Sequence, residues 1–351
     1  MSSRIDARGA MADGLAAFEA AAKATGTVVS RTYTIAGLTV SLRFAGSALV
    51  ERLSAALEHH PHGKPDDRAL IVSIWDTAST GVPLPPFPAD AIDGGTTGVS
   101  RIAPPPAVRA KYRPDQRSLS LLDRATNRAV FCVADPAALA SGETGAPLRV
   151  LFHWWMADHG RQLVHAGAVG TATGGFLLAG KGGSGKSSTA LACLGSGLDY
   201  AADDYCLVSV DPTPRVHSLY SSAKLAPDQA RRFPQLASVI VNPDKLDTEK
   251  AVFLVNRRYP EHIQRGFQIS AILVPVISDG PSSRLERAPA GTALRALAPS
   301  TILQLPGAGR AALATLSRLA WLVPTFVLHL GHDLDAIPAV LAHGLVEASG
   351  S

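Results

Sequence analysis

The sequence predicts an α/β protein with a smaller, β-rich α+β domain at residues 1–145 and an α/β domain at residues 146–351. Three observations lead to this prediction. Strand-like runs dominate the first part, and residues 27–44 alternate around a small-residue turn. In the second part, strand-like apolar runs alternate with helical runs, and one of them leads into a glycine-rich loop. Residues 136–147, rich in small residues, glycine and proline, form the expected boundary.

Most elements expected in the first part are strands. Two β-rich runs flank Ala36-Gly37, and a small-residue turn between such runs predicts a hairpin. Residues 47–59 carry leucines four apart and predict a helix with Ser47 as its N-cap. The remaining expected elements are an alanine-rich helix and three strand-like runs, which in chain order cover 15–24, 70–75, 110–122 and 128–133. A proline-rich loop is expected at 83–106.

The first part shows no catalytic constellation. Three histidines within residues 59–62 lie in a Pro/Gly-rich loop without a cysteine or carboxylate spaced to join them, so we expect a solvated loop rather than a metal site. Trp154 and Trp155, in an expected helix at 148–159, should pack in a core or at a domain interface rather than stack on bases, because no basic side chains surround them. The role of this domain is either recognition of a substrate or partner, or support of the fold.

The second part alternates strands and helices from residue 162 onward. Short apolar runs bounded by turn residues predict its strands, at 163–169, 175–179, 198–208, 215–219, 251–255, 269–276 and 326–330. Good helix formers follow the glycine-rich loop, and two further helices are expected to close the chain at 311–321 and 334–345.

The glycine-rich loop is the most specific feature of the sequence. It consists of Gly180, Lys181, Gly182, Gly183, Ser184, Gly185, Lys186 and Ser187, which match G-x-x-x-x-G-K-[ST] and are followed by Ser188. Glycines let backbone N–H groups converge on a phosphate, because no Cβ blocks its approach. Lys186 can reach the β and γ phosphates, and Ser187 can place its hydroxyl on Mg²⁺. The loop therefore predicts a site for a nucleoside triphosphate with Mg²⁺, formed by these residues together with Ser188.

Two adjacent carboxylates, Asp203 and Asp204, lie in an otherwise apolar run that returns from the helix after the loop. That strand would bring both carboxylates toward the γ-phosphate. One carboxylate can hold Mg²⁺ while its neighbour accepts the proton of an attacking hydroxyl. Because adjacent side chains on a strand point to opposite faces, the pair requires either a division of labour or a kink.

Three motifs occur in the order and spacing of HPr kinase/phosphorylase catalytic domains, namely Val164-His165-Ala166-Gly167, Gly185-Lys186-Ser187 and Ala202-Asp203-Asp204. Over about residues 163–208 the sequence therefore resembles that family, whose domains have the phosphoenolpyruvate-carboxykinase-like phosphate-loop fold. The resemblance implies an ATP-dependent serine kinase with ATP and Mg²⁺ as its cofactors.

The resemblance also implies roles for single residues. Lys186 and the loop amides would bind the triphosphate, and Ser187 and Asp204 would bind Mg²⁺. Asp203 would be the general base, with His165 close to it and to the reacting phosphate. The basic side chains considered for the transferred phosphoryl group are Lys224 as first choice, Arg257 and Arg258 as second, and also Lys250 and Arg265.

The acceptor implied by the resemblance is a serine of a peptide or small protein. The family's glycine-rich signature after the carboxylates is absent from this sequence, which leaves HPr as acceptor and the reverse reaction open. The chain looks more similar to HPr-kinase-like proteins of peptide-biosynthesis clusters, including kinases of lasso-peptide precursors, in which a stretch like Leu303-Gln304-Leu305-Pro306-Gly307 is usual. Three alternatives are a kinase of a free hydroxy amino acid, a nucleotide-binding regulator without transfer activity, and a carboxykinase-type phosphotransferase.

Composition limits the remaining possibilities. The net charge is only +4, and no lysine–arginine run is interleaved with aromatic residues, so a nucleic-acid partner is not expected. The longest apolar runs are too short for a membrane span, and no membrane partner is expected. The 3 cysteines lie in apolar surroundings without CxxC spacing, which fits a reducing cytoplasm. Assembly into a homo-oligomer is left open.

Overall fold

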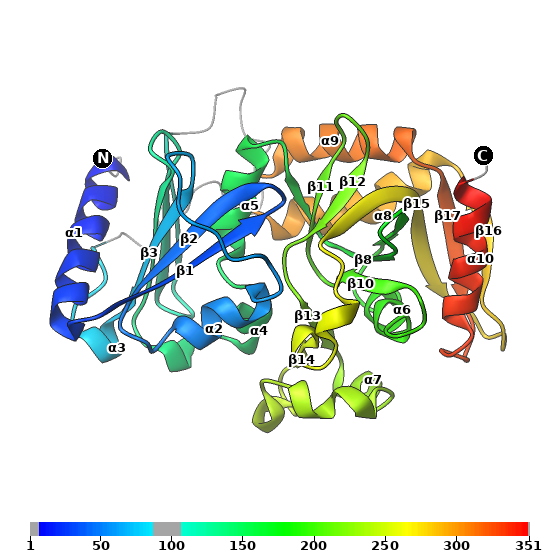
Figure 1. The fold of residues 1–351 in the computed structure, drawn as a ribbon, viewed down its shortest axis with the longest axis horizontal. Coiled ribbons are helices and arrows are strands. Elements are labelled where there is room, and N and C mark those ends of the chain that lie inside the picture. The colour runs from blue at the N-terminus through cyan, green and yellow to red at the C-terminus, as the bar shows by residue number, and fades with distance from the viewer. Residues whose placement is uncertain (1–6, 87–106, 350–351) are drawn as a thin grey trace. The chain divides into compact units, whose positions relative to one another are not determined.

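A computed structural model of the chain describes residues 7–86 and 107–349, and these fold into two compact units (Figure 1). Unit 1 comprises Met1–Ala55 and His60–His159, and unit 2 comprises Ala56–His59 and Gly160–Ser351. The division falls between His159 and Gly160, later than the boundary expected at residue 145. The reason is that helix α5 (Arg149–Asp158) packs on a strand of unit 1.

Within the described residues, unit 1 contains a six-stranded sheet in the order β1-β2-β3-β6-β5-β4. Its strands are β1 (Val28–Ile35), β2 (Leu38–Ala45), β3 (Leu70–Asp76), β4 (Val108–Arg113), β5 (Ser118–Asp123) and β6 (Arg128–Val133). Strands β2, β3 and β6 run parallel, and the other pairings are antiparallel. The hairpin and the strands at 70–75 and 128–133 are confirmed, and the run at 110–122 is two strands joined by a turn.

Helices of unit 1 differ more from the sequence expectation. Helix α1 (Ala7–Thr25) is longer than the predicted 15–24, and it buries Phe18 against the sheet. The helix predicted at 47–59 is wrong in length and cap. Helix α2 covers only Val50–Ser54, followed by a 3₁₀ turn, and its N-cap is Leu49 without a side-chain hydrogen bond. After the 3₁₀ turn no further helical turn forms, and the Ala56 carbonyl accepts from the backbone N–H and the hydroxyl of Ser221.

Three smaller helices complete the described part of unit 1, namely α3 (Thr77–Thr80), α4 (Ser141–Gly145) and α5. Residues 87–106 of the expected proline-rich loop lie outside the described residues. Trp154 and Trp155 are each 1% exposed, so both side chains are packed away from solvent, as expected. The indole N–H of Trp155 donates to Asn127 Oδ1 at 2.9 Å, so the one polar atom of that ring is satisfied.

The part of unit 2 that the structure describes contains a nine-stranded sheet and a two-stranded sheet. The larger sheet follows the path β10-β8-β9-β15-β12-β11-β7, and β17 and β16 extend it from β15. Its strands are β7 (Gln162–Val164), β8 (Ala166–Gly170), β9 (Gly175–Ala179), β10 (Asp199–Ala202), β11 (Cys206–Ser209), β12 (Arg215–Ser218), β15 (Gly266–Ile277), β16 (Arg284–Ala288) and β17 (Thr325–Leu330). Strands β13 (Ser222–Leu225) and β14 (Ala251–Leu254) form the small sheet.

Helices cover both faces of the large sheet, so unit 2 is an α/β unit, as predicted (Figure 1). The helices on the large sheet are α6 (Lys186–Ala192), α8 (Ala290–Gln304), α9 (Gly309–Leu322) and α10 (Ile337–Ser349), and α7 (Pro227–Ala230) packs beside β13. The closing helices were predicted within a few residues. Helix α8 and strands β13 and β16 were not predicted, and the strands expected at 163–169 and 198–208 are each broken in two.

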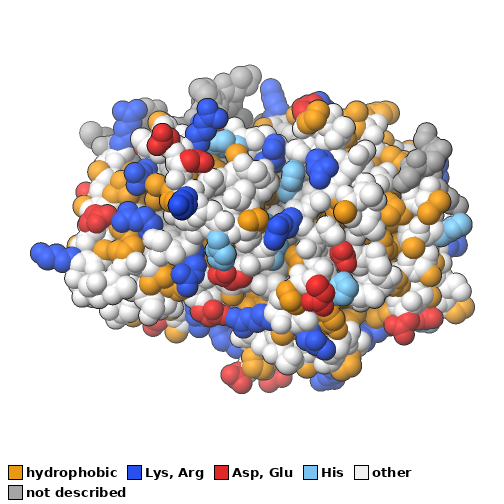
Figure 2. Space-filling view, in the orientation of Figure 1, with side chains coloured by type: hydrophobic (Ala, Val, Ile, Leu, Met, Phe, Trp, Pro, Cys, Tyr) orange, Lys and Arg blue, Asp and Glu red, His pale blue; other side chains and the backbone are white. Residues whose placement is uncertain are grey.

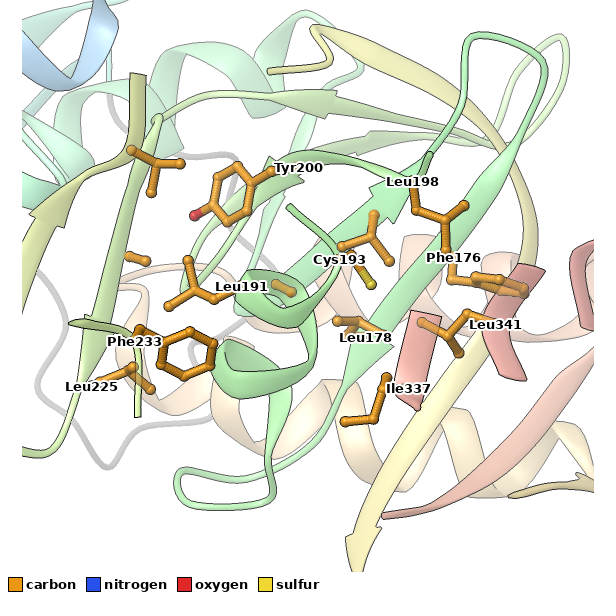
Figure 3. Packing of buried hydrophobic residues seen from close by; sticks show 14 of the residues in the cluster. Phe176, Leu178, Leu191, Cys193, Leu198, Tyr200, Leu225, Phe233, Ile337 and Leu341 are labelled. Atoms are coloured by element: carbon orange, nitrogen blue, oxygen red, sulfur yellow. The ribbon is translucent and has the colours of Figure 1, made fainter. Parts of the chain in front are cut away.

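Two apolar clusters follow from the alternation of side chains along β9 and β15. In Figure 3, Phe176 and Leu178 of β9, Leu191 of α6, and Ile337 and Leu341 of α10 point into one cluster. The alternate residues of these strands pack against α8 and α9 on the opposite face. The loop between β9 and α6 is thereby held at one edge of a buried sheet.

Surface charge is dispersed. On the face shown in Figure 2, lysine and arginine side chains are scattered among acidic and hydrophobic ones and do not gather into a single patch. Across residues 7–86 and 107–349, none of the helices combines the length and hydropathy needed to cross a bilayer.

Candidate active site

The phosphate loop joins β9 to α6 as the sequence predicts. Gly183 and Gly185 have φ values of +79° and +101°, in the region that favours glycine. A Cβ on Gly185 would lie 2.3 Å from Leu330 Cδ1, so a larger residue would be strained by the backbone and would displace the buried Leu330 side chain of β17. The backbone N–H of Thr189 donates to the Gly185 carbonyl at 2.9 Å, which starts the helix directly behind the loop.

Lys186 folds back over the loop. Its Nζ donates to the carbonyls of Gly180 (2.7 Å) and Lys181 (3.0 Å), and the residue is only 5% exposed. Burial lowers the pKa of Lys186, and the charges of Asp203 and Asp204 act in the opposite direction. The ammonium group therefore lies on the loop carbonyls, and the charges of the two carboxylates help to keep it protonated.

The chain kinks at the two carboxylates, one of the two outcomes the sequence had left open. Strand β10 ends at Ala202 and β11 begins at Cys206, with Asp204 at a φ of +67° between them. This left-handed conformation is uncommon for a residue with a side chain, although aspartate tolerates it better than most. At this kink Asp203 bonds Ser187 of the glycine-rich loop, while Asp204 bonds Lys224 and His165.

Asp203 is the buried member of the pair, with 1% exposure. Ser187 Oγ donates to its Oδ1 at 2.8 Å, and the backbone N–H of Lys224 donates to its Oδ2 at 3.0 Å. Burial and the neighbouring charge of Asp204 raise the pKa of Asp203, and these two hydrogen bonds oppose the rise. Asp203 is thus joined directly to the loop hydroxyl that was assigned to Mg²⁺.

Asp204 is the accessible member, with 28% of its side chain exposed. Its Oδ2 accepts from Lys224 Nζ at 2.8 Å, and its Oδ1 lies 3.1 Å from His165 Nε2. Burial acts to raise the pKa of Asp204, but the hydrogen bond from His165 and the charge of Lys224 outweigh it and hold the pKa well below its usual range. Asp204 therefore stays ionised.

His165 lies between β7 and β8, at the break in the strand expected at 163–169. Its backbone N–H donates to Thr301 Oγ1 at 3.2 Å, and its ring lies 5.5 Å from the Tyr205 ring. The structure places its Nε2 against Asp204, whereas the resemblance implied a position beside Asp203.

Of the basic residues considered, Lys224 on β13 is brought to both carboxylates, by its side chain and by its backbone. The Arg258 guanidinium instead lies over the Tyr259 ring at 5.2 Å. Arg257 lies in the 3₁₀ turn Val255–Arg257 that follows β14.

Sequence reasoning missed the part of the site that comes from α8. Thr301 supports the His165 backbone, and Gln304 accepts a hydrogen bond from the Tyr205 hydroxyl at 2.5 Å. Helix α8 itself was not predicted, and Thr301 belongs to no motif. Gln304 lies in the stretch Leu303-Gln304-Leu305-Pro306-Gly307 noted in the sequence, but nothing local connected that stretch to the site.

The oxygen donors at the site suit Mg²⁺. Ser187, Asp203 and Asp204 supply a hydroxyl and two carboxylates, the hard ligands that this ion prefers. Among the described residues, no group of three or more histidine, cysteine, aspartate and glutamate side chains could hold a metal by itself. Such a pair of carboxylates is the kind that binds Mg²⁺ together with water and substrate phosphates rather than in an all-protein cage.

Of the comparisons with known proteins, only the comparison with solved structures gave a match. No protein-family model matches the sequence, and no curated protein does. Among solved structures, the chain is similar to the Hpr(Ser) kinase/phosphatase from Coxiella burnetii, with 13% sequence identity and a TM-score of 0.31. The match covers 54% of this chain and 99% of that chain.

Proposed function

We propose that this protein is an ATP-dependent kinase that transfers the γ-phosphoryl group to a serine hydroxyl of a peptide or small protein. The observation that carries the proposal is the junction of a complete phosphate loop with two carboxylates, in which Ser187 of the loop donates to Asp203. A loop that only bound nucleotide would not need the second, accessible carboxylate Asp204, held by His165 and Lys224. This contrast favours transfer over a regulatory role.

In this proposal the chain's cations hold the phosphates. Lys186 Nζ leaves the carbonyls of Gly180 and Lys181 to contact the β and γ phosphates, together with the loop N–H groups. We assign Lys224 Nζ, which donates to Asp204, to neutralising charge on the phosphoryl group during transfer. Mg²⁺, when bound by Ser187 and a carboxylate, supplies further charge neutralisation on the phosphate oxygens.

The contacts favour an exchange of the two carboxylate roles implied by the resemblance. Asp203 shares a hydrogen bond with Ser187 and is 1% exposed, so it suits the metal side of the site. The carboxylate that orients the acceptor hydroxyl has to reach it, and Asp204 is 28% exposed. Because the pKa of Asp204 is held low, it suits accepting a hydrogen bond from that hydroxyl rather than removing its proton early. We therefore assign Asp204 to the acceptor and Asp203 to Mg²⁺, with His165 orienting Asp204.

Transfer of label from γ-labelled ATP to a panel of acceptors tests the function. The panel contains serine peptides, HPr and free serine, each with Mg²⁺, and every reaction is repeated with the Asp204→Asn variant. Label on a peptide or protein serine that disappears in the variant supports the proposal. Label on free serine alone would make the protein a metabolite kinase, and ATP binding without transfer would make it a regulator.

A magnesium titration separates the two carboxylates. Asp203→Asn is expected to raise the Mg²⁺ concentration needed for half-maximal activity, whereas Asp204→Asn should lower kcat with little change in that concentration. The opposite pattern would restore the roles that the resemblance implied.

A further inference from the structure

Three parallel strands end beside the phosphate loop. Strand β15 lies between β9 and β17, with Leu273 opposite Leu178 on one side and Ile277 opposite Leu330 on the other. Ligands of open α/β sheets bind outside the carboxyl ends of such strands. The ends of β15 and β17 are therefore the surface next to any nucleotide whose phosphates occupy the loop.

Side chains from these two strands support the loop directly. A Cβ on Gly185 would lie 2.3 Å from Leu330 Cδ1 and 4.0 Å from Pro275 Cβ. Both residues are buried, and Leu330 belongs to the cluster that contains α6. Pro275 and Leu330 thus form the floor beneath the glycine that precedes Lys186.

Ile277 continues this floor beyond the loop. It follows Pro275 by two residues and pairs with Leu330, so all three side chains lie on the α6 face of the sheet. Unlike the other two, Ile277 is 65% exposed. An apolar side chain of this size at the rim of a polar loop leaves a surface that water solvates poorly.

The backbone at Ile277 is fixed. The Ser278 N–H donates to the Leu330 carbonyl at 2.9 Å, and the Ser278 hydroxyl donates to the same oxygen at 2.9 Å. These bonds tie the end of β15 to β17. The exposed side chain therefore lies on a rigid strand end and not on a free loop.

We propose that Ile277 is the apolar contact for the heterocyclic base of the bound nucleotide. This inference rests on the proposed function, because it requires a nucleotide in the phosphate loop. The base is the flat, weakly solvated part of that ligand and is tethered to the phosphates, and Ile277 is an exposed apolar side chain on the floor that supports the loop. The remaining exposure of Ile277 is what the base would cover.

Binding of two ligands separates the base from the phosphates. Calorimetric titrations would compare ATP with inorganic tripolyphosphate, each with Mg²⁺, on wild type, Ile277→Ser and Val276→Ser. Val276 is the matched control, because it is 45% exposed on the same strand but points to the opposite face. Ile277→Ser should weaken ATP binding about fivefold to tenfold and leave tripolyphosphate binding within about twofold. Val276→Ser should leave both within about twofold.

The other possible outcomes of these titrations separate the inference from the proposed function. Equal weakening of ATP and tripolyphosphate by Ile277→Ser would show that the residue supports the loop and not the base, and would overturn the inference. Unchanged ATP affinity would overturn it as well. If wild type binds ATP as expected, the proposed function survives either result. If wild type binds neither ligand, the nucleotide site itself fails, and the proposed function fails with it.

Discussion

Lys224 offers the sharpest test of the site, because its side chain and its backbone serve different carboxylates. Its Nζ donates to Asp204 at 2.8 Å, while its backbone N–H donates to Asp203 at 3.0 Å. The substitution Lys224→Met removes only the first bond and keeps much of the apolar length of the side chain. Asp203 retains both of its hydrogen bonds, so the effect isolates the charge beside Asp204.

The magnitude follows from partial burial. Exposed ion pairs contribute about 0.2–1 kcal/mol, and breaking a buried pair costs about 3–5 kcal/mol. The side chains of Lys224 and Asp204 are 17% and 28% exposed, and Asp204 keeps His165 and gains water when the lysine is lost. We therefore expect the free energy of unfolding to fall by about 1–2 kcal/mol. Loss of a cation aimed at the transferred phosphoryl group should lower kcat by about a hundredfold.

Denaturant unfolding and steady-state kinase assays measure the two effects. Lys245→Met is the control, because its Nζ lies 3.7 Å from Glu249 in a pair whose members are 46% and 30% exposed. That variant should lose less than about 0.5 kcal/mol and keep its activity. A stability loss for Lys224→Met no larger than that of Lys245→Met would refute the reasoning, and wild-type kcat in Lys224→Met would remove the lysine from the reaction.

Two further predictions concern stability. Burial, helped by two nearby arginines, lowers the pKa of His217 from 6.5 to about 4. As the pH falls, His217 therefore becomes protonated in the unfolded chain before it does in the folded protein. Acidification from pH 6.5 to 4 should lower the free energy of unfolding by up to about 3 kcal/mol. Denaturant unfolding at several pH values measures this loss, which the His217→Gln variant should not show. Gly185→Ala should lower the free energy of unfolding by about 2 kcal/mol, because the φ of this residue is +101° and the new Cβ would meet Leu330. Gly182→Ala is the control: its Cβ would enter open space, and the substitution should cost less than about 0.5 kcal/mol. Equal stability of the two alanine variants would contradict the packing argument.

Strands were predicted better than helices, for a physical reason. Strands β3 and β6 of unit 1 are short apolar runs, so their local pattern and their burial agree. Helix α8 has no such pattern, and its interior Pro299 argues against a helix at a cost of about 3 kcal/mol. It forms because Ala293, Leu297 and Thr301, spaced four apart, are buried against the large sheet. Tertiary packing there outweighs local propensity.

The sequence by itself determined the parts of the site that are contiguous in the chain. The loop from Gly180 to Ser187 depends on glycine conformations and on charge carried by neighbouring residues, and both are local properties. The adjacency of Asp203 and Asp204, and the need for a kink between them, could also be read from residue order.

Only the tertiary structure decided which distant groups meet these residues. His165 is held by Thr301, 136 positions away, and Lys224 reaches Asp204 because β13 passes beside the broken strand. The exposure of Ile277 beside a buried Leu330 likewise depends on where β15 and β17 end in register. Such contacts depend on strand order and register, which are fixed by burial of the whole sheet rather than by any local run of residues.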